Sequence, residues 1–172
     1  MKFRGGGKAP ARAAAVALML IVMTTLAACS ATKPAPDVTF TTLSGRKVAM
    51  QDLRGKVVIV NFWATTCAVC VKEMPDMARV YQRFHDRGFE LVAVAMRYDP
   101  PNRVLDFVGG EKLPFSVALD PLGQIEAAFG GVPGTPTTFI IDKRGEIVQR
   151  IVGAADFPRL HTLLDAKLRE TT

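Results

Sequence analysis

A strand pattern that leads directly into two closely spaced cysteines constrains this chain more than any other feature. Residues 57–62 read Val-Val-Ile-Val-Asn-Phe, an almost unbroken apolar run typical of a strand that is covered on both faces. Cys67 and Cys70 follow after a few residues, and residues 68–87 then place apolar side chains at three- and four-residue spacing. That spacing is typical of an amphipathic helix. The segment therefore predicts a strand, a turn and a helix that begins at the cysteine pair.

The position of the two cysteines indicates their chemistry. A helix start carries unpaired N–H groups and partial positive charge, so it stabilises a thiolate at Cys67. A thiolate is the form that attacks disulfides, and Cys67 is therefore the expected nucleophile. We expect Cys70, one turn further along, to be buried and to resolve the mixed disulfide by attacking the sulfur of Cys67. Half of a zinc site and a passive bridge are the alternatives, although so short a loop would constrain the unfolded chain little.

Glu73 is the candidate proton acceptor of this pair. It lies three residues beyond Cys70, on the same helical face one turn away. A carboxylate there could take the proton of Cys70 directly or through a water molecule. The alternative is a solvated surface glutamate beside Lys72.

A second motif, Gly-Thr-Pro-Thr-Thr-Phe, occupies residues 134–139 and places Pro136 directly before an apolar strand. A proline in this position is a candidate for a cis peptide bond. If it packs against the cysteine loop, the backbone of Thr135 is available to pair with an extended substrate peptide. An ordinary turn proline is the alternative.

The first 28 residues have the layout of a bacterial export signal. Basic residues without any acid occupy residues 1–12, an apolar run extends from Ala13 to Leu26, and Leu-Ala-Ala-Cys ends at Cys29. The run is shorter than a helix that spans a bilayer. Because the last four residues resemble a lipobox, we predict a lipoprotein signal peptide over residues 1–28 and lipidation of Cys29. An ordinary signal peptide and an uncleaved anchor are the alternatives.

The export signal also explains most of the net charge. The 172-residue chain has a formal charge of +6 from 22 basic and 16 acidic side chains. Four of the basic residues and none of the acidic ones lie in residues 1–28, which leaves 18 against 16 and a net charge of +2. A nucleic-acid partner inferred from the high isoelectric point would therefore be a mistake.

The rest of the chain predicts one α/β domain over residues 38–170, preceded by a Pro/Ala linker over residues 29–37. The expected strands are 39–43, 47–50, 57–62, 89–96, 115–119, 137–141 and 146–152, and the expected helices are 68–87, 102–108, 124–129 and 156–168. The first two strands form an N-terminal β-hairpin, and the whole predicts a mixed central sheet flanked by helices. Pro75 should kink the first helix, Asn102 should cap the second, and Gly109-Gly110 should end it.

The two motifs together resemble the TlpA/ResA-like branch of the thioredoxin family, whose members are membrane-tethered bacterial thiol–disulfide oxidoreductases. The resemblance rests on Val-Asn-Phe-Trp-Ala-Thr-Thr-Cys-Ala-Val-Cys-Val-Lys-Glu-Met-Pro, on Gly-Thr-Pro-Thr-Thr-Phe and on Ile-Asp-x-x-Gly-Glu-Ile. It covers residues 38–168 and implies a thioredoxin-like fold with a central insertion at residues 100–122.

The resemblance also implies roles for single residues. Cys67 and Cys70 correspond to the redox-active disulfide, Pro136 to the cis-proline that faces it, and Glu73 to a buried acid. The residues expected to bind substrate are Trp63, Thr135 and Pro136. Asn61 departs from thioredoxin itself, which has a buried aspartate there.

By the same resemblance, the function is that of a lipid-anchored disulfide reductase on the periplasmic side of a bacterial membrane. Its substrates would be exported proteins that contain disulfides, such as apocytochrome c during cytochrome c maturation, and an inner-membrane thiol donor would recharge it. We expect a monomer with no cofactor, no metal and no nucleic-acid partner. An oxidant could use the same scaffold, so the direction of electron flow stays open.

Two other functions are less compatible with the spacing. A peroxidase of the peroxiredoxin type needs Pro-x-x-x-Thr/Ser-x-x-Cys, which precedes neither Cys67 nor Cys70. A copper chaperone of this fold usually combines Cys-x-x-x-Cys with a distal histidine, one residue more than the spacing here.

Overall fold

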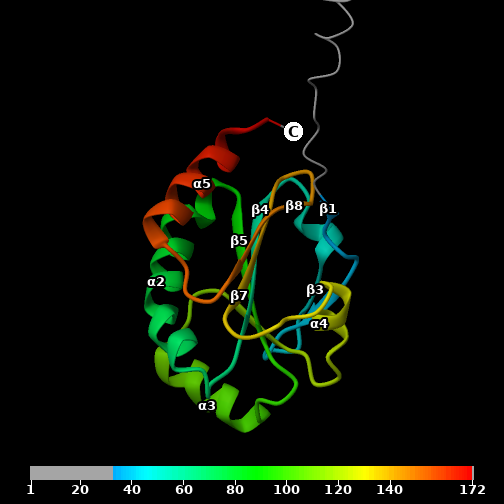
Figure 1. Cartoon of the computed structure of the whole chain (residues 1–172), viewed down its shortest axis with the longest axis vertical. Helices are drawn as coiled ribbons and strands as arrows, with labels where there is room; N and C mark the ends of the chain where they lie inside the picture. Colours follow the sequence, from blue (N-terminus) through cyan, green and yellow to red (C-terminus); the bar gives the residue numbers. More distant parts are fainter. Residues whose placement is uncertain (1–32, 172) are drawn as a thin grey trace, which may run out of the picture. The chain divides into compact units, whose positions relative to one another are not determined.

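The structure, a computed structural model, describes residues 33–171 and is built around a six-stranded sheet (Figure 1). The strands, in their order across the sheet, are β1 (Lys33–Pro34), β8 (Glu146–Val152), β7 (Thr137–Ile141), β4 (Val57–Trp63), β5 (Phe89–Ala95) and β6 (Ser116–Leu119). A separate hairpin consists of β2 (Thr39–Thr41) and β3 (Lys47–Ala49). The helices are α2 (Ala68–Phe84), α3 (Pro101–Glu111), α4 (Gln124–Ala128) and α5 (Phe157–Arg169), with 3-10 turns η1 (Met50–Leu53) and η2 (His85–Arg87).

Strand β4 lies in the middle of the sheet and leads directly to the cysteine pair. It pairs parallel with β5 and antiparallel with β7, so the sheet is mixed, as the sequence predicts. All seven of its residues are buried, which agrees with the unbroken apolar run.

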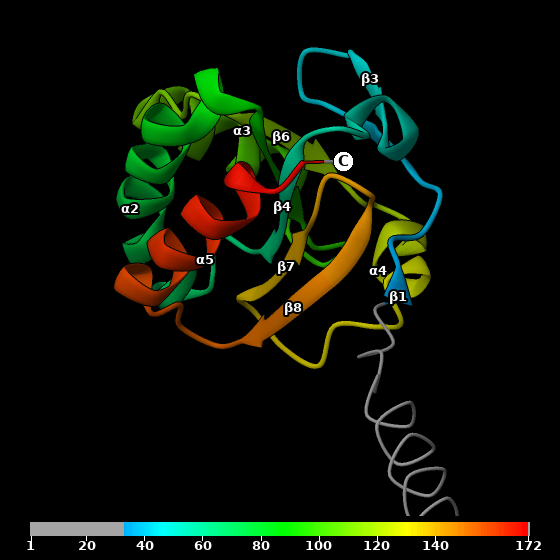
Figure 2. The same cartoon turned by 90° about the horizontal axis from the view of Figure 1, so that it is seen from above.

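Helices α2 and α5 cover one face of the sheet, and the hairpin and helix α4 cover the other (Figure 2). Val57, Ile59 and Trp63 of β4 pack with α2 and α5, whereas Val58 and Phe62 pack with the hairpin and α4. This division follows from the alternation of side chains along a strand. The mixed sheet between these layers confirms the predicted thioredoxin-like architecture.

Helix α3 corrects two details of the prediction. It begins at Pro101 with Pro100 as the N-cap, so Asn102 lies inside the helix and does not cap it. The early start is favourable because a proline at the first helical position already has the required φ. It also continues through Gly109-Gly110 to Glu111, beyond the expected end. Apolar residues of this helix pack on the core, and this packing outweighs the low helix propensity of two glycines.

The described part of the predicted linker is attached to the domain. Lys33 and Pro34 pair antiparallel with Ile147 and Glu146 of β8, and the Ala35 N–H donates to the Gly145 carbonyl at 2.9 Å. A two-residue edge strand with a proline is compatible with a sheet, because the proline needs no partner on its outer side. The predicted signal peptide and Cys29 lie outside the described residues, and none of the helices in residues 33–171 is long and apolar enough to cross a membrane.

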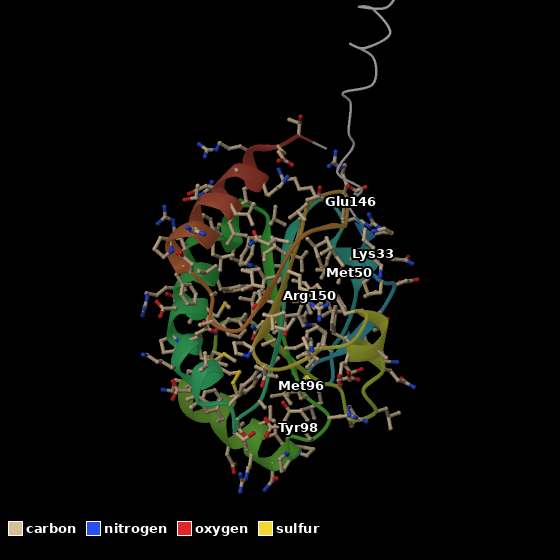
Figure 3. The ribbon with its side chains drawn as sticks, in the orientation of Figure 1. Lys33, Met50, Met96, Tyr98, Glu146 and Arg150 are labelled. Carbon is tan, nitrogen blue, oxygen red and sulfur yellow. A yellow bond between two sulfur atoms is a disulfide. The ribbon has the colours of Figure 1, made fainter. Side chains whose placement is uncertain are left out.

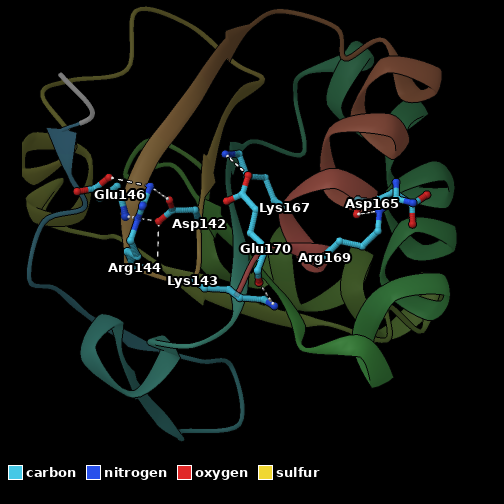
Figure 4. A network of polar contacts seen from close by, with 8 residues as sticks. All are labelled: Asp142, Lys143, Arg144, Glu146, Asp165, Lys167, Arg169 and Glu170. Carbon is cyan, nitrogen blue, oxygen red and sulfur yellow. Dashed lines mark hydrogen bonds and ion pairs between the residues drawn. The ribbon is translucent and has the colours of Figure 1, made fainter. Parts of the chain in front are cut away.

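The turn between β7 and β8 is tied to the end of α5 (Figure 4). Lys143 Nζ donates to the carbonyl oxygens of Leu168 and Glu170, each at 2.8 Å. In the same turn, the buried carboxylate of Asp142 accepts from the backbone N–H of Arg144 at 3.0 Å. A lysine at these carbonyls satisfies acceptors that the helix itself leaves open.

Candidate active site

Cys67 lies at the end of a tight turn and is the N-cap of α2. The turn closes where the Cys67 N–H donates to the Ala64 carbonyl at 3.1 Å. The Sγ of Cys67 then accepts from the Cys70 N–H at 3.2 Å, so the sulfur satisfies one of the open donors of the helix start. The predicted position of the sulfur at the helix start is therefore confirmed.

The two cysteines form a disulfide, with their Cα atoms 5.2 Å apart. Cys67 is half-buried, whereas Cys70 is 2% exposed. The burial of Cys70 agrees with the prediction. This asymmetry lets the sulfur of a substrate approach Cys67, whereas Cys70 is accessible only to Cys67.

The second motif meets the first at Cys67, although the two are far apart in the sequence. The Thr135–Pro136 peptide is cis, as expected, and Pro136 is buried. The Thr135 carbonyl oxygen lies 3.5 Å from Cys67 Sγ, so the reduced thiol can donate to it. A substrate disulfide at Cys67 would therefore lie against the backbone of Thr135.

Glu73 is buried in α2 and reaches across to the segment before α5. It is 8% exposed, which excludes a solvated surface position, and its Oε1 accepts from the Ala155 N–H at 2.6 Å. Burial raises the pKa of Glu73 above its usual value, and the Asp76 charge adds to the rise, although the Ala155 hydrogen bond opposes it. Glu73 thus combines proximity in the helix with a raised proton affinity, as a proton acceptor for a thiol requires.

Trp63 is not where the prediction placed it. We expected it at the substrate surface, but it is 0% exposed, because its side chain points toward the helices and α3 covers it. Its ring lies 5.3 Å, between centroids, from that of Phe107. Among residues 33–171 the Trp63 indole N–H has no hydrogen-bond partner. A bound peptide would therefore not touch Trp63 in this arrangement.

Asn61 is buried in the middle of the sheet, 3% exposed, and its amide donates to Thr138 Oγ1 at 2.9 Å. The residue that departs from thioredoxin is thus a satisfied neutral side chain and not a buried acid.

The structure adds two residues that the sequence did not indicate as part of the site. Asp99 contacts the turn before Cys67, and Tyr98 Oη lies 3.4 Å from Thr135 Oγ1. Their only signal in the sequence is the pair of prolines that follows Asp99. Within residues 33–171, no group of three or more His, Cys, Asp or Glu side chains is arranged to hold a metal ion.

A thioredoxin-like sheet that presents a Cys-x-x-Cys disulfide at a helix start, beside a cis-proline, defines a thiol–disulfide oxidoreductase. Comparison with known proteins supports this class. The family model described as Redoxin matches residues 30–164. The chain is similar to the thiol-disulfide oxidoreductase ResA of Bacillus thuringiensis subsp. konkukian, with 40% identity over 121 residues that cover 70% of this chain and 69% of the relative. ResA of Bacillus subtilis is 34% identical over 131 residues, 76% of this chain and 72% of the relative.

Solved structures show the same similarity. A putative thioredoxin from Neisseria meningitidis superposes with a TM-score of 0.75 at 36% identity and covers 81% of this chain and 93% of its own. A putative thiol:disulfide interchange protein DsbE from Chlorobium tepidum gives 0.74 at 32% identity, over 80% and 96% of the two chains. The chain belongs to the ResA-like thioredoxin family, and its activity is that of a thiol–disulfide oxidoreductase.

Proposed function

We propose that this oxidoreductase acts as a disulfide reductase on exported proteins, held at the periplasmic side of a bacterial membrane by a lipid on Cys29. The observation that carries the mechanism, with Cys67 as the attacking and Cys70 as the resolving cysteine, is the asymmetry of the pair. Cys67 is half-buried beside the Thr135 carbonyl, whereas Cys70 is 2% exposed in the same helix as the buried Glu73.

In the first step, the Cys67 thiolate attacks one sulfur of the substrate disulfide. A bond forms between Cys67 Sγ and that sulfur, and the other substrate sulfur leaves as a thiolate that takes a proton. The Cys70 N–H, 3.2 Å from Cys67 Sγ in the disulfide form, stabilises the attacking thiolate. The Thr135 backbone holds the substrate peptide alongside.

In the second step, Cys70 loses its proton to the carboxylate of Glu73, directly or through water, and attacks Cys67 Sγ. The mixed disulfide breaks, and the second substrate sulfur leaves as a thiolate that takes a proton. The substrate is thus released as a dithiol that has gained two electrons. The protein is left with the Cys67–Cys70 disulfide, the state that the structure describes. A membrane thiol donor must then supply two electrons for the next cycle.

The proposed client is apocytochrome c before haem attachment, whose cysteines lie in Cys-x-x-Cys-His. This choice rests on the family resemblance and on the predicted export signal. An oxidised peptide with this motif is therefore the probe for the proposal.

The proposal is tested by mixing the reduced protein with that peptide. We expect one peptide disulfide to be reduced per protein, as the Cys67–Cys70 disulfide forms. The Cys70→Ser variant should stop at a stable mixed disulfide through Cys67, and the Cys67→Ser variant should give neither product. A peptide with its cysteines far apart in sequence is the control for client preference.

Two results would contradict the proposal. The first is a Cys70→Ser variant that forms no mixed disulfide with either peptide. The second is transfer in the opposite direction, in which the disulfide form of the protein oxidises the reduced peptide and holds it oxidised at equilibrium.

A further inference from the structure

The carboxylate of Asp99 reaches from the end of β5 to the turn that carries Cys67. Asp99 is 4% exposed, and both of its oxygens contact one residue of that turn. Oδ2 accepts from the Thr65 backbone N–H at 2.5 Å, and Oδ1 accepts from the Thr65 hydroxyl at 2.6 Å. Hydrogen bonds to a carboxylate are stronger than hydrogen bonds between neutral groups. The two contacts from Asp99 therefore restrain both the backbone and the side chain of Thr65.

Thr65 is the second residue of the turn that places the nucleophile. The turn runs from Ala64 to Cys67 and closes through the Cys67 N–H to the Ala64 carbonyl at 3.1 Å. Its last residue caps α2 with Sγ, which accepts from the Cys70 N–H. Because the turn is so short, the conformation at Thr65 sets the direction in which the Cys67 sulfur points.

Asp99 is itself held by contacts that do not involve the cysteines. Its N–H donates to the Met96 carbonyl at 2.9 Å, and the Met96 N–H donates to the Trp63 carbonyl at 3.0 Å. Pro100 and Pro101 follow it directly, which restricts the backbone at Asp99. The segment that positions Thr65 is therefore a turn that begins where Met96 continues the pairing of β5 with β4.

The same segment also contacts the second loop of the site. Tyr98 Oη lies 3.4 Å from Thr135 Oγ1, and Figure 3 labels Met96 and Tyr98 at the end of the molecule where α3 lies. The segment 96–99 thus reaches both of the loops that meet at Cys67.

We propose that Asp99 is a positioning residue for thiol–disulfide exchange. It holds the turn 64–67 so that the Cys67 sulfur stays at the start of α2, where the helix stabilises its thiolate. The inference goes beyond the proposed function, because it applies whether the pair reduces or oxidises its substrates.

The test measures the alkylation rate of Cys67 against pH in the reduced full chain, with Cys29 and Cys70 replaced by serine. The Asp99→Ala variant should shift the midpoint of the alkylation profile to higher pH and slow alkylation at pH 7 by about threefold or more, as expected for a weakened helix cap. This direction is diagnostic. Removal of a nearby negative charge alone would favour the thiolate and move the midpoint to lower pH.

The chain offers a conservative variant and a matched control. Asp99→Asn keeps an oxygen for the Thr65 N–H and an amide for the hydroxyl, so it should restore most of the alkylation rate that Asp99→Ala loses. Asp120 is equally buried, at 4% exposed, and accepts from the N–H groups of Ile125 and Glu126 at 3.2 and 2.8 Å. Asp120→Ala should therefore lower the melting temperature but leave the alkylation profile of Cys67 unchanged.

An Asp99→Ala variant that melts earlier but keeps the wild-type alkylation profile would overturn the proposal, because Asp99 would then act on stability alone. A shift to lower pH would overturn it as well.

If Asp99→Ala does not fold, the Thr65→Val variant is used for the same measurement, since it removes only the hydroxyl contact. A smaller shift to higher pH is then expected, and no shift would overturn the proposal. Failure of the peptide-reduction experiment would leave these outcomes unaffected.

Discussion

Glu73 is the residue whose environment bears most directly on the reaction. It is buried in α2, one turn beyond Cys70, and its Oε1 accepts from Ala155 in the segment before α5. Its carboxylate is thus held by a long-range contact that the sequence could not indicate. The spacing in the helix, in contrast, is local, and the sequence was sufficient to predict it.

Replacing Glu73 by glutamine should separate the two steps of the reaction. Glutamine keeps an oxygen for the Ala155 N–H but cannot accept the proton of Cys70. We expect resolution of a mixed disulfide at Cys67 to slow by about a hundredfold or more, as for the loss of a general base. Alkylation of Cys67 should be nearly unchanged. Rapid mixing followed by acid quench measures the first rate, and equal effects on both rates would defeat the assignment.

The raised pKa of Glu73 also predicts how the stability of the protein depends on pH. Because burial raises the pKa of Glu73 above its usual value of 4.5, ionisation favours the unfolded chain. The stabilising contribution of Glu73 is therefore fully present below about pH 4.5 and is lost as the pH rises through the folded-state value.

We accordingly expect the melting temperature of Glu73→Gln, relative to that of the unsubstituted chain, to be higher at pH 8 than at pH 4. Thermal unfolding of the disulfide form at the two pH values measures this difference. A difference that is constant with pH would mean that Glu73 titrates as an ordinary exposed carboxylate does.

Helix α3 shows which features of one element can be predicted from the local sequence and which cannot. The sequence predicts a helix at the beginning of the insertion, but it does not predict that the helix passes through Gly109-Gly110. Packing of Val104 and Phe107 on the core decides this, and packing is not visible in local propensity. The same packing covers Trp63, which the family resemblance placed among the substrate-binding residues.

Helix α5 depends on a contact from the β7–β8 turn, and this contact is testable. Lys143→Met should lower the free energy of unfolding by about 1 kcal/mol, because the carbonyls of Leu168 and Glu170 lose their charged donor. Urea unfolding measures the change. The same substitution at Lys47, which is exposed in β3, is the control and should have little effect. Equal losses in both variants would show that the contact does not stabilise the domain.

At the scale of the whole molecule, the order of strands and helices could be predicted because each strong pattern is local. The apolar run of β4, the helix that follows the cysteines and the final hairpin were all predicted with the correct type. The meeting of the two motifs at Cys67 followed only from the family resemblance. The contacts of Asp99 could not be predicted, since a single acid in a loop has no periodic pattern.

The predicted tether is also a property of the whole chain. Cys29→Ser in the full chain, expressed in a bacterium that processes lipoproteins, should move the protein from the membrane fraction to a soluble fraction. Loss of the lipid removes the only anchor that the prediction supplies. Fractionation of cells, followed by detection of the protein, measures this. Retention of the variant in the membrane would favour an uncleaved signal anchor.

The equilibrium redox potential of the Cys67–Cys70 pair is the most direct test of the central claim, that this oxidoreductase acts as a reductant. Thioredoxin-fold pairs extend from about −270 mV for thioredoxin to about −120 mV for a strong oxidant. Equilibration of the protein with glutathione buffers of known ratio measures the potential. The account predicts a value near the thioredoxin end of this range. A value near −120 mV would contradict it, because such a pair would oxidise its substrates.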